Sequence, residues 1–125
     1  MLDETTKGVF TIAATPFTPE GAVDFDSIDR MVDAYIEKGA DGLTILGMMG
    51  EAGKLSSAES VAVVERVTAR CSLPVVVGVS APGFAAMRAL SDEAMSSGAA
   101  GVMVAAPRGL QTDAQIISYF HNTAD

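Results

Sequence analysis

The sequence has little of the residues that bind metals or form disulfides. Its 125 residues contain one cysteine, Cys71, and one histidine, His121. A single cysteine cannot form an internal disulfide, and one isolated histidine does not provide a set of metal ligands. We therefore expect no metal site and no cofactor. Cys71 is expected to be a small packing residue, and His121 to lie on the surface of the last helix.

Positive charge and long apolar runs are also scarce. Eight basic residues stand against 16 acidic ones, and the net charge of −8 repels phosphate backbones and anionic membrane surfaces. No apolar run approaches the roughly 20 residues of a membrane span. The opening residues, MLDETTKG, lack the basic start and apolar core of a signal peptide. We expect a cytoplasmic protein that binds neither nucleic acid nor membranes.

What the sequence does have is short apolar runs at regular intervals. Four such runs cover residues 8–14, 42–47, 74–80 and 101–106. Their nearly continuous apolar character predicts strands that are buried on both faces of a parallel sheet. They recur at roughly the 30-residue spacing of one βα step. The segments GADGLTILG (39–47) and GAAGVMVAA (98–106) align position by position, which indicates that the βα unit itself recurs.

The segments between the runs have the period of helices. One apolar stripe comprises Ile28, Met31, Val32, Tyr35 and Ile36. A third helix is expected over 83–97, with Phe84, Met87, Leu90 and Ala94 facing inward.

Start and stop signals mark the ends of these helices. Asp26 is expected to cap the first helix, and the pairs Ser56–Glu59 and Thr112–Gln115 have the spacing of capping boxes. Gly39 and Gly98 stand where helix ends need a left-handed residue.

These elements predict an α/β fold of four βα units, equivalent to the first half of a (β/α)8 TIM barrel. A whole barrel needs about 250 residues, so we expect a single N-terminal half-barrel over residues 1–125, truncated from a longer chain. An open, doubly wound four-stranded sheet is the alternative. The barrel is favoured because the first run leads into TPFTPEGAVDFD, which lacks the glycine-rich turn of nucleotide-binding sheets.

In a barrel, the chemistry lies at the carboxyl ends of the strands. The turns to examine are therefore residues 15–17, 47–51, 80–82 and 107–109, which should share one face.

The same turns carry a resemblance to a known family. The sequence has TPF after the first strand, GADGLTILG leading into MMGE after the second, LSSAE opening the next helix, PVVVGV as the third strand, and GAAGVMVAAP as the fourth. In this order and spacing they resemble the pyruvate-dependent class I aldolases typified by dihydrodipicolinate synthase and N-acetylneuraminate lyase. The resemblance spans nearly the whole chain and implies the first half of a TIM barrel.

The resemblance also implies a substrate site for pyruvate or another 2-keto acid. The family's loop at 47–51 grips the substrate carboxylate with the residues that match Met48 and Met49, and backbone N–H groups of Met49 and Gly50 can do so whatever their side chains. Thr15, after the first strand, is a further expected binding residue. Methionine cannot carry a proton, however, so Met48 cannot replace the hydroxyl that the family's proton relay uses there.

A second departure from the family lies after the fourth strand. Arg108 and Gly109 stand where family members commonly have two tyrosines. A guanidinium forks onto a carboxylate or a phosphate, so Arg108 is a candidate substrate ligand; a solvated loop arginine is the alternative. Glu51 is expected to hold loop N–H groups with its carboxylate.

The third departure concerns lysine. Class I aldolases form a Schiff base between a lysine amine and the keto acid, and the family's lysine lies on a sixth strand that this chain does not contain. The lysines present are Lys7, Lys38 and Lys54, and Lys54 is the nearest to the expected site. We therefore expect no catalytic residue in this chain, which alone is inactive; the complete enzyme would make or break a carbon–carbon bond.

Two functional hypotheses remain open. The chain is either the N-terminal half of such an aldolase or lyase, or a non-catalytic half-barrel that acts as an assembly or binding module. Half a barrel leaves unpaired strand edges and an uncovered interior. We therefore expect self-association as a homo-oligomer, or pairing with a missing C-terminal half.

Overall fold

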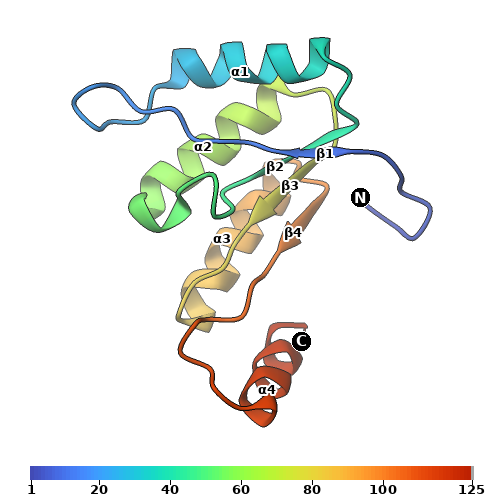
Figure 1. The fold of residues 1–125 in the computed structure, drawn as a ribbon, viewed down its shortest axis with the longest axis vertical. Coiled ribbons are helices and arrows are strands. Elements are labelled where there is room, and N and C mark those ends of the chain that lie inside the picture. The colour runs from blue at the N-terminus through green and yellow to red at the C-terminus, as the bar shows by residue number, and fades with distance from the viewer. Residues whose placement is uncertain (125) are drawn as a thin grey trace.

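The computed structural model describes residues 1–124, which form four βα units (Figure 1). The strands are β1 (Phe10–Ile12), β2 (Gly42–Ile45), β3 (Val75–Gly78) and β4 (Gly101–Met103). The helices are α1 (Phe25–Glu37), α2 (Ser57–Arg70), α3 (Phe84–Ser96) and α4 (Asp113–Ala124), with a short 3-10 helix, η1 (Ala52–Lys54), before α2. The predicted α/β fold of four repeating units is confirmed.

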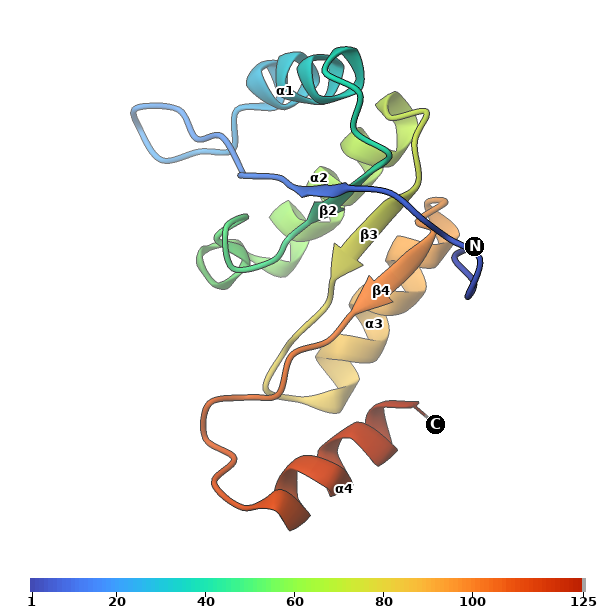
Figure 2. The ribbon, with the colours of Figure 1, turned by 45° about the vertical axis from the view of Figure 1, so that its right-hand side comes forward.

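The sheet has the arrangement of a barrel rather than of a doubly wound sheet. Its strands are all parallel and lie in the order β1-β2-β3-β4, the order of the sequence. Helices α1, α2 and α3 cover one face of the sheet, and α4 follows beyond the end of β4 (Figures 1 and 2). A doubly wound sheet would have helices on both faces, so this alternative is wrong.

The strands are shorter than the predicted runs, although the ladder continues past them. The Ala13 N–H donates to the Thr44 carbonyl at 2.9 Å, and the Val79 N–H donates to the Met103 carbonyl at 3.0 Å. Strand β2 stops at Ile45 because Leu46 has a φ of 54°, outside the extended region.

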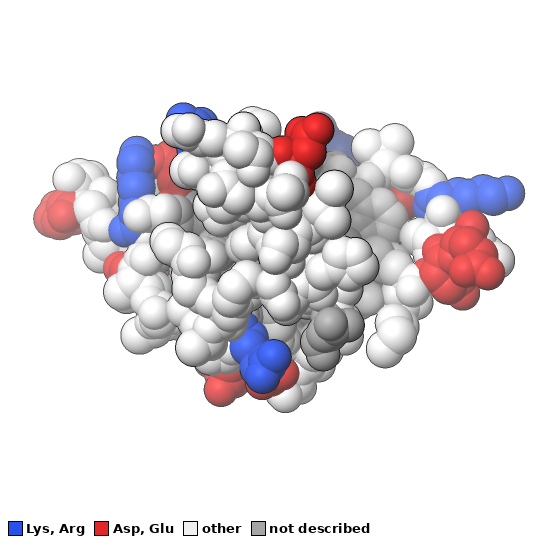
Figure 3. Space-filling model, turned by 90° about the horizontal axis from the view of Figure 1, so that it is seen from below, with Lys and Arg blue, Asp and Glu red and all other residues white. Residues whose placement is uncertain are grey.

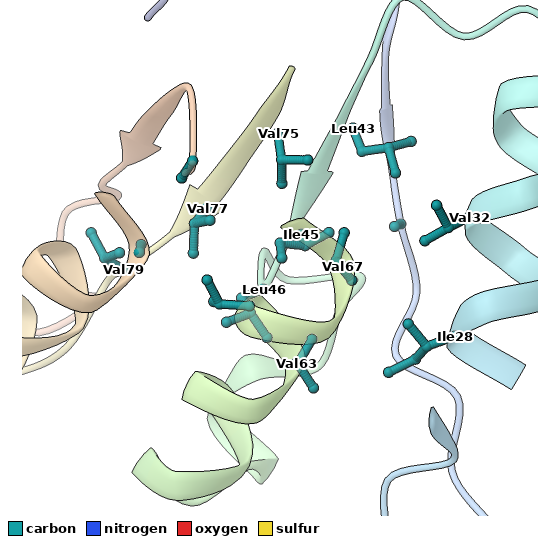
Figure 4. Close-up of a cluster of buried hydrophobic side chains, with 14 of the residues drawn as sticks. Ile28, Val32, Leu43, Ile45, Leu46, Val63, Val67, Val75, Val77 and Val79 are labelled. Atoms are coloured by element: carbon teal, nitrogen blue, oxygen red, sulfur yellow. The ribbon is translucent and has the colours of Figure 1, made fainter. Parts of the chain in front are cut away.

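The core lies between the sheet and the helices that cover it (Figure 4). Its members are the alternate residues of β2 and β3 with the apolar stripes of α1 and α2: Ile28, Val32, Leu43, Ile45, Val63, Val67, Val75 and Val77. All four residues of β2 are buried. Burial on both faces is wrong for the outer strands, because Ile12 on β1 is 50% exposed and Met103 on β4 is 42% exposed. The face opposite the helices is open at these strands.

The helix ends follow the sequence signals in all but one case. The Ser56 hydroxyl accepts from the Glu59 N–H while the Glu59 carboxylate accepts from the Ser56 N–H, and Thr112 and Gln115 make the same reciprocal pair. Gly39 and Gly98 have φ values of 81° and 93°, as predicted for helix ends. The predicted cap Asp26 is wrong: Asp24 precedes the helix, accepts from the Ser27 N–H at 2.9 Å, and leaves Asp26 in the first turn.

Helix α3 confirms three of its four predicted inward residues. Met87 and Ala94 are buried and Leu90 is half-buried, but Phe84 is 45% exposed. The Phe84 ring stacks on Tyr119 of α4, with ring centroids 5.5 Å apart. This ring faces the neighbouring helix and not the sheet.

Ion pairs join α1 to α2 on their outer surface. Arg66 donates to both carboxylate oxygens of Asp29, at 2.8 and 2.7 Å, and Arg70 donates to both oxygens of Asp33. These hydrogen bonds from arginine lower the pKa of the Asp29 and Asp33 carboxyls below the ordinary range of aspartate.

The N-terminal segment ties the two outer strands together. The Leu2 N–H donates to the carbonyl of Ala100, just before β4, at 3.0 Å, and the same segment leads directly into β1.

Among residues 1–124, no helix is long and apolar enough to cross a membrane.

Candidate substrate pocket at the strand ends

The carboxyl ends of β2, β3 and β4 enclose a cavity of about 500 Å³. Its lining comes from Leu46 and the loop after β2, from Gly78 and Ser80 at the end of β3, and from Met103, Ala105 and Arg108 at and after the end of β4. The prediction that these turns share one face is confirmed, because the strands are all parallel and Thr15 after β1 donates to Gly50 in the loop after β2. The turn after β1 does not line the cavity, but it is hydrogen-bonded to the loop after β2, which does.

Thr15 anchors the loop after β2. Its side chain is buried, and its hydroxyl donates to the Gly50 carbonyl at 2.6 Å. Gly50 is itself buried, so this hydrogen bond anchors the loop after β2 to the end of β1. Thr15 does not line the cavity, whereas we expected from the sequence that it binds the substrate directly.

Backbone geometry fixes the loop from Leu46 to Glu51. Both of these residues have a left-handed φ, of 54° and 53°, which side-chain-bearing residues adopt only at a cost. The Leu46 carbonyl lies against Gly78 of β3, so close that a Cβ at Gly78 would be 2.3 Å from the Leu46 oxygen. The Glu51 N–H donates to the Met48 carbonyl at 3.1 Å and closes the turn.

The two methionines at the tip of this loop point differently. Met48 is 87% exposed and lines the cavity, whereas Met49 is 64% exposed and is not part of the lining. Within residues 1–124, the N–H groups of Met49 and Gly50 donate no hydrogen bond. Neither Met49 nor Gly50 lines the cavity, so the role of their N–H groups as donors to the substrate carboxylate stays a prediction.

Met103 is a pocket residue that the sequence reasoning missed. It is paired in register with Gly78 across the β3–β4 ladder, and its methyl group lies 3.7 Å from where a Cβ at Gly47 would be. The side chain therefore crosses the end of β3 toward the loop after β2. Only the alternation along β4, which puts Met103 on the face away from the helices, was available in the sequence as a signal.

The charged side chains at the cavity are Glu51, Lys54 and Arg108. The Glu51 carboxylate pairs with the Lys54 ammonium, so the prediction that it holds loop N–H groups is wrong. Its left-handed backbone turns the side chain toward η1. Arg108 lines the cavity and makes no hydrogen bond or ion pair within residues 1–124.

The other titratable candidates lie away from the cavity. His121 is exposed on α4, and Cys71 is the half-buried residue at the end of α2. Across the described part of the chain, no cluster of histidine, cysteine, aspartate and glutamate side chains could hold a metal ion. Among the lysines, only Lys54 reaches the cavity; its side chain is 73% exposed.

The fold and sequence are similar to known proteins along nearly the whole chain. The model of the dihydrodipicolinate synthetase family matches residues 5–124. The crystal structure of dihydrodipicolinate synthase from Rhodopseudomonas palustris superposes with a TM-score of 0.94 and 51% identity, over 98% of this chain and 41% of that one. A 4-hydroxy-tetrahydrodipicolinate synthase from Sorangium cellulosum is 45% identical over 104 residues, covering 81% of this chain and 35% of the relative.

A third relative was crystallised with a ligand. It is YagE, a prophage protein of the dihydrodipicolinic acid synthase family from E. coli K12, solved in complex with pyruvate. It superposes with a TM-score of 0.86 and 29% identity, over 94% of this chain and 40% of that one. The chain thus spans about two fifths of the length of these relatives, and its four βα units match the N-terminal part of their barrel. This chain belongs to the dihydrodipicolinate synthetase family.

Proposed function

We propose that this chain forms the N-terminal part of a lyase that binds pyruvate or another 2-keto acid in the cavity at the strand ends. In the complete enzyme, a lysine amine attacks the ketone carbon, water leaves, and the resulting imine allows a carbon–carbon bond to be made or broken. The observation that carries the proposal is the cavity, which Arg108 lines without a partner within residues 1–124. The loop after β2 borders it, and the N–H groups of Met49 and Gly50 in this loop donate no hydrogen bond within the same residues.

These groups suit an acid whose carboxylate carries a full negative charge. Backbone N–H groups and a guanidinium both make strong, charge-assisted hydrogen bonds to a carboxylate. The pyruvate complex of the E. coli relative supports the same ligand class here. The proposal gives the cavity the task of holding the acid, and leaves the covalent step to a lysine outside these 125 residues.

The lysines in the chain are poor candidates for the covalent step. Lys7 lies in the N-terminal segment and Lys38 at the end of α1, both outside the cavity. Lys54 is at the cavity, but its ammonium pairs with Glu51 and its side chain is 73% exposed. Met48 adds no proton donor, since a thioether has none.

Borohydride trapping with pyruvate tests the proposal directly. The 125-residue chain and a longer product of the same reading frame are each incubated with pyruvate, reduced with borohydride and weighed by intact mass spectrometry. We expect a pyruvate adduct on the longer product alone. An adduct on the 125-residue chain would assign the chemistry to one of its own lysines, and peptide mapping of a Lys54→Arg variant would show which.

An assembly or binding module is the second candidate function, and a different observation favours it. The open face of β1 and β4 exposes Ile12 and Met103, while α4 exposes Ile117 and Phe120. Seen from the α4 end, the surface is largely uncharged, with the charged side chains near its margins (Figure 3). Apolar surface of this kind and the free edges of β1 and β4 favour association with a second copy or with a C-terminal half-barrel.

Sedimentation velocity tests this second candidate, with a dye for exposed apolar surface as a parallel probe. We expect association that grows with concentration. A stable monomer that binds no dye would contradict it, and the absence of any pyruvate adduct on the longer product would favour it over the lyase. The cytoplasm stays the proposed compartment, and cell fractionation would test it.

A further inference from the structure

The cavity at the strand ends is lined by apolar side chains and by one guanidinium that has no partner within residues 1–124. Leu46, Met48, Met103 and Ala105 contribute apolar atoms, whereas Arg108 contributes a guanidinium. A binding site with both kinds of lining suits an acid that carries a hydrocarbon group. The carboxylate can bind the guanidinium while the hydrocarbon group contacts the apolar side chains. Pyruvate has only a methyl group to place against the apolar wall.

The apolar wall exists because a glycine stands between its two halves. Gly78 is the register partner of Met103 and also lies against the Leu46 carbonyl. With no side chain at this position, the Met103 side chain extends across the end of β3 until its methyl group is near Gly47. Two thioethers, one on β4 and one on the loop after β2, thereby border the same space.

These thioethers are free to close on a ligand. Met48 is 87% exposed and Met103 is 42% exposed, so both have apolar surface that a bound group would remove from water. Methionine is flexible and polarisable and adapts to irregular apolar shapes. It offers no hydrogen-bond donor, so it gives nothing to a ligand that is polar throughout.

The charges at the cavity leave one cation for the carboxylate. Lys54 and Glu51 pair with one another, while Arg108 has no ionic or hydrogen-bonding partner within residues 1–124. A guanidinium binds a carboxylate through two parallel hydrogen bonds, which fixes the direction in which the rest of the acid points. Arg108 lines the same cavity as Met48 and Met103, so an acid held by its guanidinium can place a hydrocarbon group beside the two thioethers.

We propose that Met48 and Met103 are specificity-determining residues that make this pocket prefer 2-keto acids with a branched aliphatic side chain over pyruvate. This inference rests on the proposed function, because it takes 2-keto acid binding as given and names the subclass. The cavity of about 500 Å³ lies within the range of roughly 300 to 1,000 Å³ found for small-molecule sites. It has room for an isobutyl group beside the two thioethers.

Binding of two acids compared by methionine-methyl NMR tests the proposal. The protein, labelled with ¹³C at its methionine methyls, is titrated with pyruvate and with α-ketoisocaproate. Each buried methylene strengthens binding roughly fourfold, and the cavity is open on one side, so we expect α-ketoisocaproate to bind about tenfold more tightly. The Met48 and Met103 methyl signals should shift, and the Met95 signal on α3 should not.

Variants assign the preference to particular side chains. Met48→Ser should reduce the preference about threefold, because it removes one of the two thioethers that border the cavity. The Met48 side chain is 87% exposed, so its loss should not affect folding. Met95→Ser is the matched control and should leave the preference unchanged. Arg108→Gln should weaken both acids alike and keep their ratio, since it removes the carboxylate contact that they share.

Each outcome separates this inference from the proposed function. Equal or tighter binding of pyruvate at the same methyl signals would overturn the inference and leave keto-acid binding intact. A preference that survives Met48→Ser would overturn the role of that methionine. No shift of either methyl with either acid would overturn both the inference and the assignment of the cavity as the keto-acid site.

Discussion

Replacing Thr15 by valine removes the hydrogen bond that anchors the pocket loop while keeping the shape of the side chain. The hydroxyl of Thr15 donates to the Gly50 carbonyl at 2.6 Å, and both residues are buried. In Thr15→Val, that carbonyl loses its partner without gaining access to water. Leaving a buried acceptor unsatisfied costs about 1–3 kcal/mol, so we expect the free energy of unfolding to fall by about 2 kcal/mol.

Urea unfolding followed by circular dichroism measures this loss. With a slope of roughly 1.5 kcal/mol per molar urea, a loss of about 2 kcal/mol lowers the midpoint by roughly 1 M. Hydrogen exchange adds a local readout. Amides of residues 47–51 should exchange faster in Thr15→Val than those of β3, because the loop loses its anchor while the sheet keeps its ladder.

Thr68→Val is the matched control for this substitution. The Thr68 hydroxyl also donates to a carbonyl, that of Val64 at 2.8 Å, but this carbonyl lies inside α2, where helix N–H groups already satisfy it. Its loss should cost little. A change below about 0.5 kcal/mol in Thr15→Val, or an equal loss in Thr68→Val, would refute the reasoning that the anchor stabilises the loop.

Two further predictions concern the frame of the fold. Gly78→Ala should lower the free energy of unfolding by about 1–3 kcal/mol, because its Cβ would lie 2.3 Å from the Leu46 oxygen; Gly53→Ala, which has nothing within 4 Å, is the control in urea unfolding. The lowered pKa of Asp29 and Asp33 means that their stabilisation is complete above the ordinary aspartate value of about 3.9 and is lost as the pH falls below it. Midpoints measured down to about pH 3 should therefore fall less steeply when both are asparagine, and equal slopes would contradict this.

Much of the fold was predictable because its signals are local. The apolar runs, the capping boxes and the glycines at helix ends each depend on residues a few positions apart. The predicted cap Asp26 failed because two aspartates flank Phe25, and the pattern does not say which of them the helix begins after. Phe84 failed for another reason: its partner, Tyr119, is 35 positions away on α4, and helical period carries no information about such a contact.

The location of the candidate site could be predicted from the sequence, but the contacts within it could not. Strand ends indicated the loop after β2 and Arg108 after β4. The sequence did not show that Thr15 donates to Gly50, nor that Met103 crosses to the same cavity, because both depend on the register between strands. Glu51 was misassigned because its left-handed backbone, which sends the carboxylate toward Lys54, has no signature in the sequence.

The loop after β2 is held in place through its backbone, so its exposed side chains can be changed while its conformation is kept. Thr15 anchors the Gly50 carbonyl, and Met48 and Met49 expose 87% and 64% of their surfaces. Replacing both methionines by threonine, as Met48→Thr with Met49→Thr, should therefore change the free energy of unfolding by less than about 0.5 kcal/mol. The same variant should reduce the preference for branched keto acids about threefold, as Met48→Ser does, because Met49 does not line the cavity and Met103 is unchanged. A large loss of stability in urea unfolding would show instead that the methionine side chains hold the loop. The conclusion that backbone contacts alone hold it would then be wrong.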